Sequence, residues 1–554
     1  MTSPVGATPG YPQYRRASPS LLVLAALGAC GGDDKSSSSA AHFDESACPF
    51  VVDASQVQGT TMRCGVLYTP EVHASASNYI QVPVLIFKGR NTTLPPMVNL
   101  SGGPGQSWAD LGLDKITAGD TQSFPMDVVF IEQRGSGLSR PRLDCPAQGS
   151  QESDANFATR CESDLRAQGV NVTAYSIQEM ADDVATFQSV LGYPKIVLDG
   201  VSYGTAWGLQ ILRAHSSIVS SAILDSVVNP AIPVFSASAS ATDAAFSAAF
   251  SACASNNSCN SAYGDIKSKM TAALASLKAK PLTVAGSTTT YTDGAMFGDA
   301  VSVLAFAPDL LPRLIGAITT ATTNGSGTLL YDSDINAITG GDTQAISGRA
   351  VGQTISVLCT DNQFVTLSQV QSDLASVNPA FSTYLDQSGF IPICQAWKYQ
   401  QRSMSEYSAV TSSVTTLLVS GSFDPLTSPV WAQQASTTLS KGYWVEFPGL
   451  GHDEGASTNS CPQNILSRFL SSPGAPDTSC VQSMSVAFAA PSNPVTVVVD
   501  AQRGVRLPAT QAAPLSLAQS GFLYQQMAMR SRIESLVGRR HIQRRMAELM
   551  RLPR

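Results

Sequence analysis

Residues 195–208, KIVLDGVSYGTAWG, restrict how this chain can fold more than any other segment. The first half is mostly apolar and favours a strand, and a run of small residues follows. Between them lies Ser202, flanked by Gly200 and Gly204, two residues without a Cβ that permit a sharp strand-to-helix turn. Such a turn presents the serine hydroxyl at the end of a strand. The same residue types also form ordinary polar turns, so the interpretation depends on the rest of the chain.

Short apolar segments alternate with amphipathic ones along much of the sequence. Strands are predicted at residues 79–87, 95–100, 127–132, 195–199, 221–228, 414–421 and 443–449. Helices are predicted at 176–192 and 205–215, and Ser176 with Glu179 forms a capping-box pattern at the start of the first. Continuous apolar runs are typical of strands that are buried on both faces. The alternation therefore predicts a mostly parallel sheet with helices on both faces.

The pattern changes in the middle of the chain. Residues 230–411 are rich in alanine and serine and are predicted to be mostly helical. We interpret them as a cap inserted between two parts of one core, residues 47–229 and residues 412–480. A C-terminal extension, residues 481–554, follows with a predicted strand at 493–500 and a tail that holds eight Arg and two Glu between residues 529 and 554.

The N-terminus has the features of an export signal. Arg15 and Arg16 precede a short apolar run, residues 21–29, which is too short to span a membrane. Cys30 then ends a segment that resembles a bacterial lipobox, so residues 1–29 are predicted to be a signal peptide and Cys30 to carry lipid. Residues 30–46 would form a flexible tether. The expected location is the bacterial cell envelope, periplasmic or on the outer surface, with the membrane as a partner through Cys30. An ordinary signal peptide with a chance cysteine is the alternative.

Cysteine usage agrees with export. Ten cysteines remain besides Cys30, and consecutive ones lie close together in the sequence: Cys48/Cys64, Cys145/Cys161, Cys253/Cys259, Cys359/Cys394 and Cys461/Cys480. Up to five disulfides in an oxidising compartment are the simplest account, although sequence alone does not fix the pairing. No Cys-x-x-Cys pair or Cys/His cluster indicates a metal site, and no cofactor is expected. A net charge of −7 argues against nucleic acid as the main partner.

A nucleophilic serine needs a base and an acid that orients the base. His452 is the best candidate base, because it lies in a loop after the last predicted strand of the core. The other histidines are His42 in the tether, His73 near the first strands, His215 at a helix end and His541 in the tail. Asp424 follows the preceding strand, 28 residues before His452. The order Ser202, Asp424, His452 is the one found in α/β-hydrolases.

The developing oxyanion requires two backbone N–H donors. One donor is expected from Tyr203, the residue that follows the nucleophile. The other is expected from the glycine-rich loop after residues 95–100, where Gly103 is favoured and Gly102 is the alternative.

Five motifs together resemble the prolyl aminopeptidase and secreted tripeptidyl aminopeptidase family of serine hydrolases. They are SGGPG at 101–105, EQRGSGLS at 132–139, GVSYGT at 200–205, GSFDPLTSP at 421–429 and GLGH at 449–452. The resemblance spans about residues 48–480 and implies an α/β-hydrolase core, a helical cap, and release of short peptides or residues from peptide N-termini. Ser101, Glu132 and Asp453 depart from the family's common residues, which leaves the substrate preference open.

An aminopeptidase must bind a free α-ammonium group, so carboxylates are expected near the cleft. Asp361 from the cap and Glu132 are the candidates, although Asp361 would also suit a solvated loop. A carboxylic-ester or small-amide hydrolase with the same three residues is the alternative function. A non-catalytic surface-binding lipoprotein is a third class, and the complete Ser, Asp and His set disfavours it.

Overall fold

The computed structural model describes residues 40–49, 51–75, 78–108, 113–149, 151–283, 290–324, 350–453 and 459–491. All of them belong to one compact unit, Ala40–Arg554. The predicted signal peptide, Cys30, the first part of the tether, the strand at 493–500 and the Arg-rich tail lie outside the described residues.

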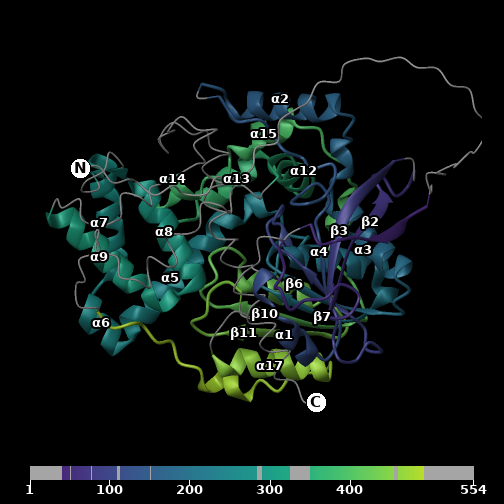
Figure 1. Cartoon of the computed structure of the whole chain (residues 1–554). Coiled ribbons are helices and arrows are strands. Elements are labelled where there is room, and N and C mark those ends of the chain that lie inside the picture. Colours follow the sequence, from purple (N-terminus) through teal and green to yellow (C-terminus); the bar gives the residue numbers. More distant parts are fainter. Residues whose placement is uncertain are drawn as a thin grey trace, which may run out of the picture. The chain divides into compact units, whose positions relative to one another are not determined.

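Nine strands form one sheet in the order β1-β2-β3-β5-β4-β6-β7-β10-β11 (Figure 1). Their bounds are β1 His42–Glu45, β2 Met62–Pro70, β3 Tyr79–Phe87, β4 Met97–Leu100, β5 Val128–Ile131, β6 Ile196–Val201, β7 Val219–Asp225, β10 Thr415–Gly421 and β11 Gly442–Phe447. The three pairings from β1 to β5 are antiparallel, and the five from β5 to β11 are parallel. Each of the seven predicted strands corresponds to an observed one, and the mostly parallel sheet is confirmed.

Helices cover both faces of the sheet because the central strands are apolar on both faces. Val98 and Leu100 of β4 pack against α3 (Ile177–Val190), α4 (Tyr203–His215) and α16 (Pro429–Ser436). Met97, the residue before Val98, points to the opposite face and packs in the cluster that includes α17 (Ser460–Ser471). This alternation follows from the two-residue repeat of a strand. Figure 1 shows α17 with α1 (Ala118–Ser123) on one side of the sheet, and α3 with α4 on the other.

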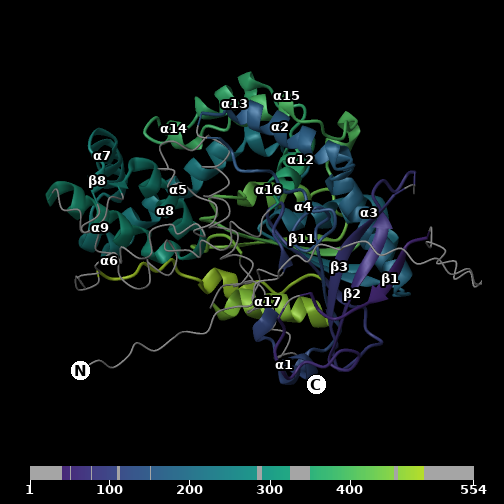
Figure 2. The same ribbon diagram turned by 45° about the horizontal axis from the view of Figure 1, so that its top comes forward.

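The middle of the chain forms the helical cap. Its helices are α5 Ser238–Ser255, α6 Asn257–Tyr263, α7 Ile266–Ala279, α8 Asp293–Phe306, α9 Leu311–Asn324, α12 Val351–Asp361, α13 Leu367–Leu374, α14 Ser382–Leu385 and α15 Phe390–Ala396. Helices α5 to α9 share one hydrophobic cluster. Helices α12 and α15 instead pack with α2 (Asp154–Ala167) of the first core part (Figure 2). A two-stranded sheet, β8 Leu282–Thr283 and β9 Thr290–Tyr291, was not predicted from the sequence.

Five disulfides join consecutive cysteines, as the sequence spacing suggests: Cys48–Cys64, Cys145–Cys161, Cys253–Cys259, Cys359–Cys394 and Cys461–Cys480. Disulfides persist in oxidising compartments, so these bonds are consistent with an extracellular protein. Among the described residues, no helix has the length and apolar character needed to cross a membrane.

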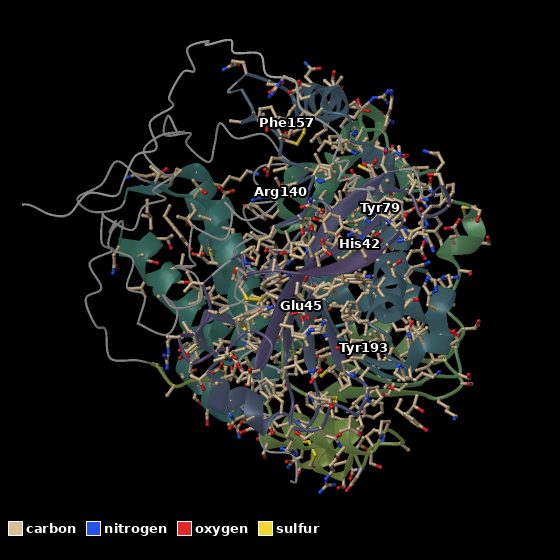
Figure 3. The ribbon with its side chains drawn as sticks, turned by 45° about the vertical axis from the view of Figure 1, so that its right-hand side comes forward. His42, Glu45, Tyr79, Arg140, Phe157 and Tyr193 are labelled. Atoms are coloured by element: carbon tan, nitrogen blue, oxygen red, sulfur yellow. A yellow bond between two sulfur atoms is a disulfide. The ribbon has the colours of Figure 1, made fainter. Side chains whose placement is uncertain are left out.

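The end of the predicted tether differs from the expectation. Residues 42–45 are not a flexible linker but strand β1, which pairs with β2. The His42 ring stacks on Tyr68 with centroids 4.6 Å apart, and Arg63 pairs with Glu45 at 2.7 Å. Figure 3 labels His42 and Glu45 on this strand. Four residues that include two acids carry no strand signal of their own, so the partner strand determines their conformation.

Only one of the two hydrogen bonds of the predicted capping box of α3 forms. Ser176 Oγ accepts a hydrogen bond from the Glu179 backbone N–H, as expected. The Glu179 carboxylate does not return to the Ser176 backbone but binds His73, with Oε2 2.6 Å from Nδ1. A partly buried partner on another segment therefore replaces the local contact.

Candidate active site

Four strand ends gather the predicted site residues at one edge of the sheet. Ser202 directly follows β6, and the Gly103 loop follows β4. Asp424 follows β10, and His452 follows β11. These strands run parallel in the order β4-β6-β7-β10-β11, so their carboxyl ends meet at the same edge. Ligands bind at this edge in open α/β sheets.

The turn at Ser202 has the strained geometry of a nucleophile elbow. Ser202 has φ 55° and ψ −125°, a conformation that few non-glycine residues adopt. Its backbone N–H donates to Asp225 O at 2.9 Å, which fixes the turn to the neighbouring strand. Gly204 is required sterically, because a Cβ there would lie 1.9 Å from Leu100 O. Strain of this kind persists only where surrounding contacts hold it, and it is common at functional sites.

The predicted acid and base are in direct contact. His452 Nδ1 lies 2.8 Å from Asp424 Oδ2, and both side chains are buried. Asp424 Oδ1 also accepts the backbone N–H groups of Leu426 and Thr427 at 2.8 and 2.9 Å. Thr427 Oγ1 donates to Asp424 Oδ2 at 2.6 Å. These bonds hold the carboxylate in the orientation that fixes the imidazole.

The environment of His452 changes its basicity. Burial lowers the pKa of His452, but the negative charge of Asp424 and its hydrogen bond raise it, and Asp453 and Asp225 act in the same direction. The net effect is a pKa above the usual value for histidine. His452 Nε2 is buried and makes no hydrogen bond. The structure therefore brings Asp424 and His452 together, while the contact from Ser202 Oγ to Nε2 is not formed. Such contacts are often long in ligand-free enzymes.

The predicted oxyanion loop lies against Ser202. A Cβ on Gly102 would be 3.2 Å from the Ser202 Cβ, and Gly103 has φ 114°, which favours glycine. Gln133 holds the loop: its Nε2 donates to Gly102 O at 2.8 Å, and its Oε1 accepts the Gly105 N–H at 2.8 Å. Gly103 and Tyr203 both line the cavity beside Ser202. The loop is thus held beside Ser202, and the role of the Gly103 N–H as an oxyanion donor stays a prediction.

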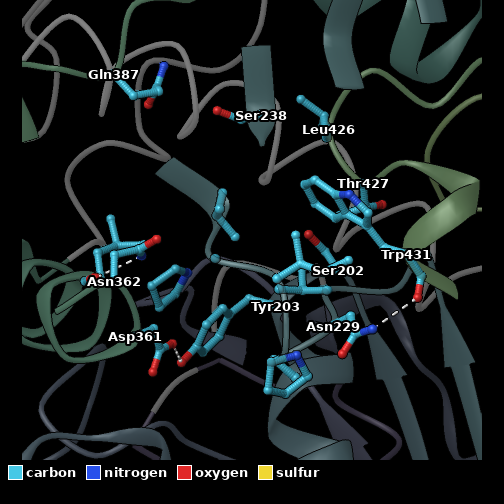
Figure 4. Close-up of a pocket in the computed structure, with 18 of the residues that line it drawn as sticks. Ser202, Tyr203, Asn229, Ser238, Asp361, Asn362, Gln387, Leu426, Thr427 and Trp431 are labelled. Atoms are coloured by element: carbon cyan, nitrogen blue, oxygen red, sulfur yellow. Dashed lines mark hydrogen bonds between the residues drawn. The ribbon is translucent and has the colours of Figure 1, made fainter. Parts of the chain in front are cut away.

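A cavity between the strand ends and the cap contains Ser202 (Figure 4). Most of its wall is apolar, with side chains such as Ile177, Val228, Phe297, Val301, Leu385 and Trp431. A mostly apolar wall with polar groups at particular places is typical of small-molecule sites. The residues with polar side chains in the lining are Ser202, Tyr203, Gln210, Asn229, Ser238, Thr242, Asp361, Asn362, Tyr384, Gln387, Arg402, Tyr407 and Thr427.

Asp361 lies in this cavity, as predicted for a residue that binds a substrate ammonium. Its Oδ2 accepts the Tyr203 hydroxyl at 2.7 Å, and its Oδ1 lies 3.5 Å from Arg402 Nη1 (Figure 4). Burial raises the pKa of Asp361 to about 6, although Arg402 and the Tyr203 hydroxyl both lower it. The Asp361 side chain keeps 22% of its surface exposed, so a ligand can reach it.

Glu132 does not lie in the cavity. Its side chain is buried, and its Oε2 accepts the Ser107 hydroxyl at 2.9 Å. A Cβ on Gly137 would be 2.6 Å from the same oxygen, so the chain closes tightly around this carboxylate. Glu132 orders the loop below the site, and its predicted role in binding a substrate N-terminus is wrong.

The prediction from the sequence did not include three residues of the site. Thr427 supports Asp424, Gln133 holds the oxyanion loop, and Arg402 lies beside Asp361. Thr427 and Gln133 fall inside the GSFDPLTSP and EQRG motifs, which was the available signal. Arg402 has no such signal, because Asp361, its partner in the cavity, lies 41 residues earlier in the chain.

We expect Thr427→Val to lower kcat by roughly 10–100-fold. Valine keeps the shape of threonine but removes the 2.6 Å bond to Asp424, and a hydrogen bond to a charged group contributes about 1.5–3 kcal/mol. Thr427→Ser, which keeps the hydroxyl, should retain most of the activity. Steady-state kinetics on both variants provides the measurement, and equal losses would assign the effect to the methyl group instead.

One group outside the cavity could hold a metal ion by its geometry, although the sequence indicated none. His73, Glu179 and Asp182 each present a ligand atom within 4.8 Å of the others. Their atoms already have partners: His73 Nδ1 binds Glu179 at 2.6 Å, and Asp182 binds His215 at 2.6 Å. The Arg134 guanidinium also lies 3.5 Å from Glu179, and its positive charge opposes a cation there.

Two family models match the chain. Residues 95–307 match a model described as the alpha/beta hydrolase fold, and residues 378–481 match one described as TAP-like protein. The first match contains Ser202, and the second contains Asp424 and His452. No curated protein matches the chain.

Solved structures with similarity to the chain include a proline iminopeptidase from Mycobacterium smegmatis. The two sequences are 13% identical, the match covers 71% of this chain and 95% of that chain, and the TM-score is 0.31. The esterase RhEst1 from Rhodococcus sp. ECU1013 has 14% identity, 71% and 96% coverage, and a TM-score of 0.31. The esterase EaEST from Exiguobacterium antarcticum has 15% identity, 68% and 90% coverage, and a TM-score of 0.30.

The sheet order, the strand-end elbow and the two family matches agree with one another. The chain therefore has the α/β-hydrolase fold, and its residues 378–481 are similar to TAP-like proteins.

Proposed function

We propose that the protein is a serine hydrolase that works through an acyl-enzyme on Ser202. His452 Nε2 takes the proton from Ser202 Oγ as the oxygen attacks the scissile carbonyl carbon. The same proton passes to the leaving amine or alkoxide when the carbonyl–heteroatom bond breaks. Water then loses a proton to His452 and attacks the acyl carbon, and Ser202 Oγ recovers the proton as it leaves. The observation that carries this proposal is the buried His452–Asp424 pair at the strand edge that also holds Ser202.

Two further groups support the reaction. Asp424, held by Thr427 and two backbone N–H groups, keeps the imidazole in one orientation and stabilises the imidazolium that forms. In this proposal the backbone N–H groups of Gly103 and Tyr203 stabilise the oxyanion, which in other hydrolases contributes about 2.7–4 kcal/mol per donor.

We propose further that the substrates are short peptides with a free N-terminus. Asp361 lines the same cavity as Ser202 and can accept a hydrogen bond from an α-ammonium group. Asp361, Arg402 and Glu406 carry one positive and two negative charges, so the group attracts a cation when Asp361 is ionised. The motifs that resemble tripeptidyl aminopeptidases and the TAP-like match support the same class. The cap above the cavity favours short chains over folded proteins.

A panel of chromogenic substrates tests this proposal. It should contain aminoacyl and tripeptidyl amides, the same amides with an acetylated N-terminus, and short-chain esters. Turnover of the free amines with little turnover of the blocked amides is expected. Turnover of esters alone would favour the alternative function, a carboxylic-ester or small-amide hydrolase with the same triad, which the apolar cavity wall also suits.

We expect Asp361→Asn to raise KM for free-amine substrates by roughly 10–100-fold, the cost of one charge-assisted hydrogen bond.

Lowering the pH should also raise KM for these substrates. Asp361 binds a cation only when ionised, and its pKa is about 6, so the affinity of the wild type should fall as the pH drops through 6. His452 must be neutral to accept a proton, so kcat should also fall on the acid side.

An acetyl ester provides the control, since it has no ammonium group. Its KM should not change in Asp361→Asn, and its pH profile should report His452 alone. An equal loss on the ester would show that Asp361 acts on the fold or on Tyr203 rather than on the substrate N-terminus.

We propose that the protein is exported and that Cys30 is lipidated. A single acyl chain gives only marginal membrane binding, whereas two or more chains anchor firmly. The wild type should therefore fractionate with membranes, and Cys30→Ser should be unprocessed or released. Detergent-free fractionation with mass spectrometry of the N-terminus provides the measurement. A soluble wild type that begins after Cys30 would contradict the anchor and leave the hydrolase proposal intact.

A further inference from the structure

The cap holds the backbone of the candidate base. The His452 N–H donates to Ala305 O, in the last turn of α8, at 2.7 Å. Carbonyl groups in the last turn of a helix lack partners within the helix, so this bond satisfies one of them. The fit is close, because a Cβ on Gly451 would lie 2.2 Å from the same oxygen. The Phe306 ring also packs edge-on against the His452 ring, with centroids 6.4 Å apart.

The same helix forms part of the cavity wall. Phe297 and Val301 of α8 line the cavity that contains Ser202. Phe297, Val301 and Ala305 are spaced four residues apart, so they lie along one side of the helix. A substrate that fills the cavity therefore touches the helix whose last turn holds His452.

A C-terminal segment ties this corner of the cap to the core. We call residues 484–490 the strap; it follows the Cys461–Cys480 disulfide and reaches the cap beside α6 (Figures 1 and 2). The Ala489 N–H donates to Asp309 O at 3.0 Å, just after α8. Three cap side chains bind the same segment: Tyr263 Oη donates to Ala489 O at 2.8 Å, Arg313 Nη2 donates to Ala490 O at 2.8 Å, and Asn256 Nδ2 donates to Val486 O at 3.3 Å.

The strap also touches the loop that carries His452. Val486 lies against Gly449, where a Cβ would be 3.0 Å from its Cγ2. Val486, Phe488 and Ala489 pack on the hydrophobic cluster of α5 to α9. The strap thus contacts both the His452 loop and the cap helices, and it bonds to the chain just after α8.

We infer that α8 is a positioning element for His452 and that the strap holds it in place. The inference rests on the proposed function of His452 as the base. The cap then does more than cover the cavity, because His452 keeps its position only while the end of α8 lies against residues 449–452. Contact of the substrate with Phe297 and Val301 favours this arrangement, so occupation of the cavity and the position of the base are coupled.

Gly451→Ala tests the inference, because its methyl group would overlap Ala305 O and push α8 away from the loop. Displacements of about 1 Å in a catalytic group can cost about 100-fold. We expect kcat to fall by roughly 10–100-fold with KM within about twofold of the wild type. Gly474→Ala is the matched control, since nothing lies within 4 Å of its added Cβ, and it should behave like the wild type.

A fluorophosphonate that labels Ser202 separates positioning of the base from substrate binding. Its reaction rate depends on His452 and not on the peptide class, and Ser202→Ala should not react. The rate should fall in Gly451→Ala in parallel with kcat. A rise in KM alone, with an unchanged labelling rate, would overturn the inference, because the contact would then act on substrate binding. If the fluorophosphonate labels the wild type faster than Gly451→Ala but the wild type cleaves no peptide or ester, the proposed function fails while the inference stands.

A second variant covers the case in which Gly451→Ala does not fold. Tyr263→Phe combined with Arg313→Leu removes side-chain bonds to the strap and leaves the His452 loop unchanged in sequence. Labelling slower than in the wild type, with a normal melting curve, supports the inference. A wild-type labelling rate in this double variant would overturn it.

Discussion

Ser202→Ala is expected to lower turnover by on the order of 10⁴-fold or more, since removal of the nucleophile disables the acyl-enzyme route. The small remaining rate would come from the oxyanion donors and from substrate binding. The variant should fold normally, because alanine is no larger than serine and meets the same backbone strain at φ 55°. Steady-state kinetics with the best substrate of the panel measures the loss.

A control variant separates this effect from general damage. Ser471→Ala changes an exposed serine at the end of α17, and its kinetics should match those of the wild type. Circular dichroism should show the same melting temperature for both variants. A Ser202→Ala protein with wild-type kcat would show that the nucleophile is another residue.

Gly204→Ala is expected to destabilise the protein by at least about 3 kcal/mol, at or beyond the upper end of ordinary overpacking. The added Cβ would lie 1.9 Å from the backbone oxygen of Leu100 and 3.0 Å from that of Ser101. These atoms belong to the strand end and to the oxyanion loop, so no side-chain rotation can relieve the overlap. Thermal unfolding and soluble yield provide the measurement.

Gly316→Ala is the matched control, because it also lies within a helix, in a partly buried part of α9. Its added Cβ would be 3.7 Å from the Tyr263 ring, an ordinary contact distance. Alanine is favoured over glycine within a helix by roughly 0.5–1 kcal/mol, so this variant should be slightly more stable than the wild type. A Gly204→Ala protein as stable as Gly316→Ala would contradict the tight turn at Ser202.

The sequence predicted those parts of the site whose residues carry local signals. Strands β4 to β7 and β10 to β11 are short apolar runs, and the glycines around Ser202 mark a turn that few residues permit. Parallel strands place their carboxyl ends together, so the order Ser202, Asp424, His452 was sufficient to predict one site. The contact between Asp424 and His452 follows from that topology rather than from any local pattern.

The missed features depend on contacts between distant segments. Strand β1 exists because β2 pairs with it, and the Glu179 carboxylate turns to His73, which is 106 residues earlier in the chain. Glu132 was assigned to the cavity because an acid near the site suits an ammonium group. Its burial beneath the loop depends on Ser107 and Gly137, whose positions no pattern in the sequence reveals.

The connectivity of the five disulfides has a consequence for biogenesis. Every bond joins a cysteine to the next one in the chain, across separations of 6 to 35 residues. A polypeptide that crosses a membrane from its N-terminus presents its thiols in this same order. With Cys30 lipidated as proposed, an oxidase that couples each newly emerged thiol to the previous unpaired one would produce the native set directly, without an isomerase to correct mispaired intermediates. The closed loops are short, so each part of the chain can be cross-linked before the sheet that unites the two halves of the core is complete.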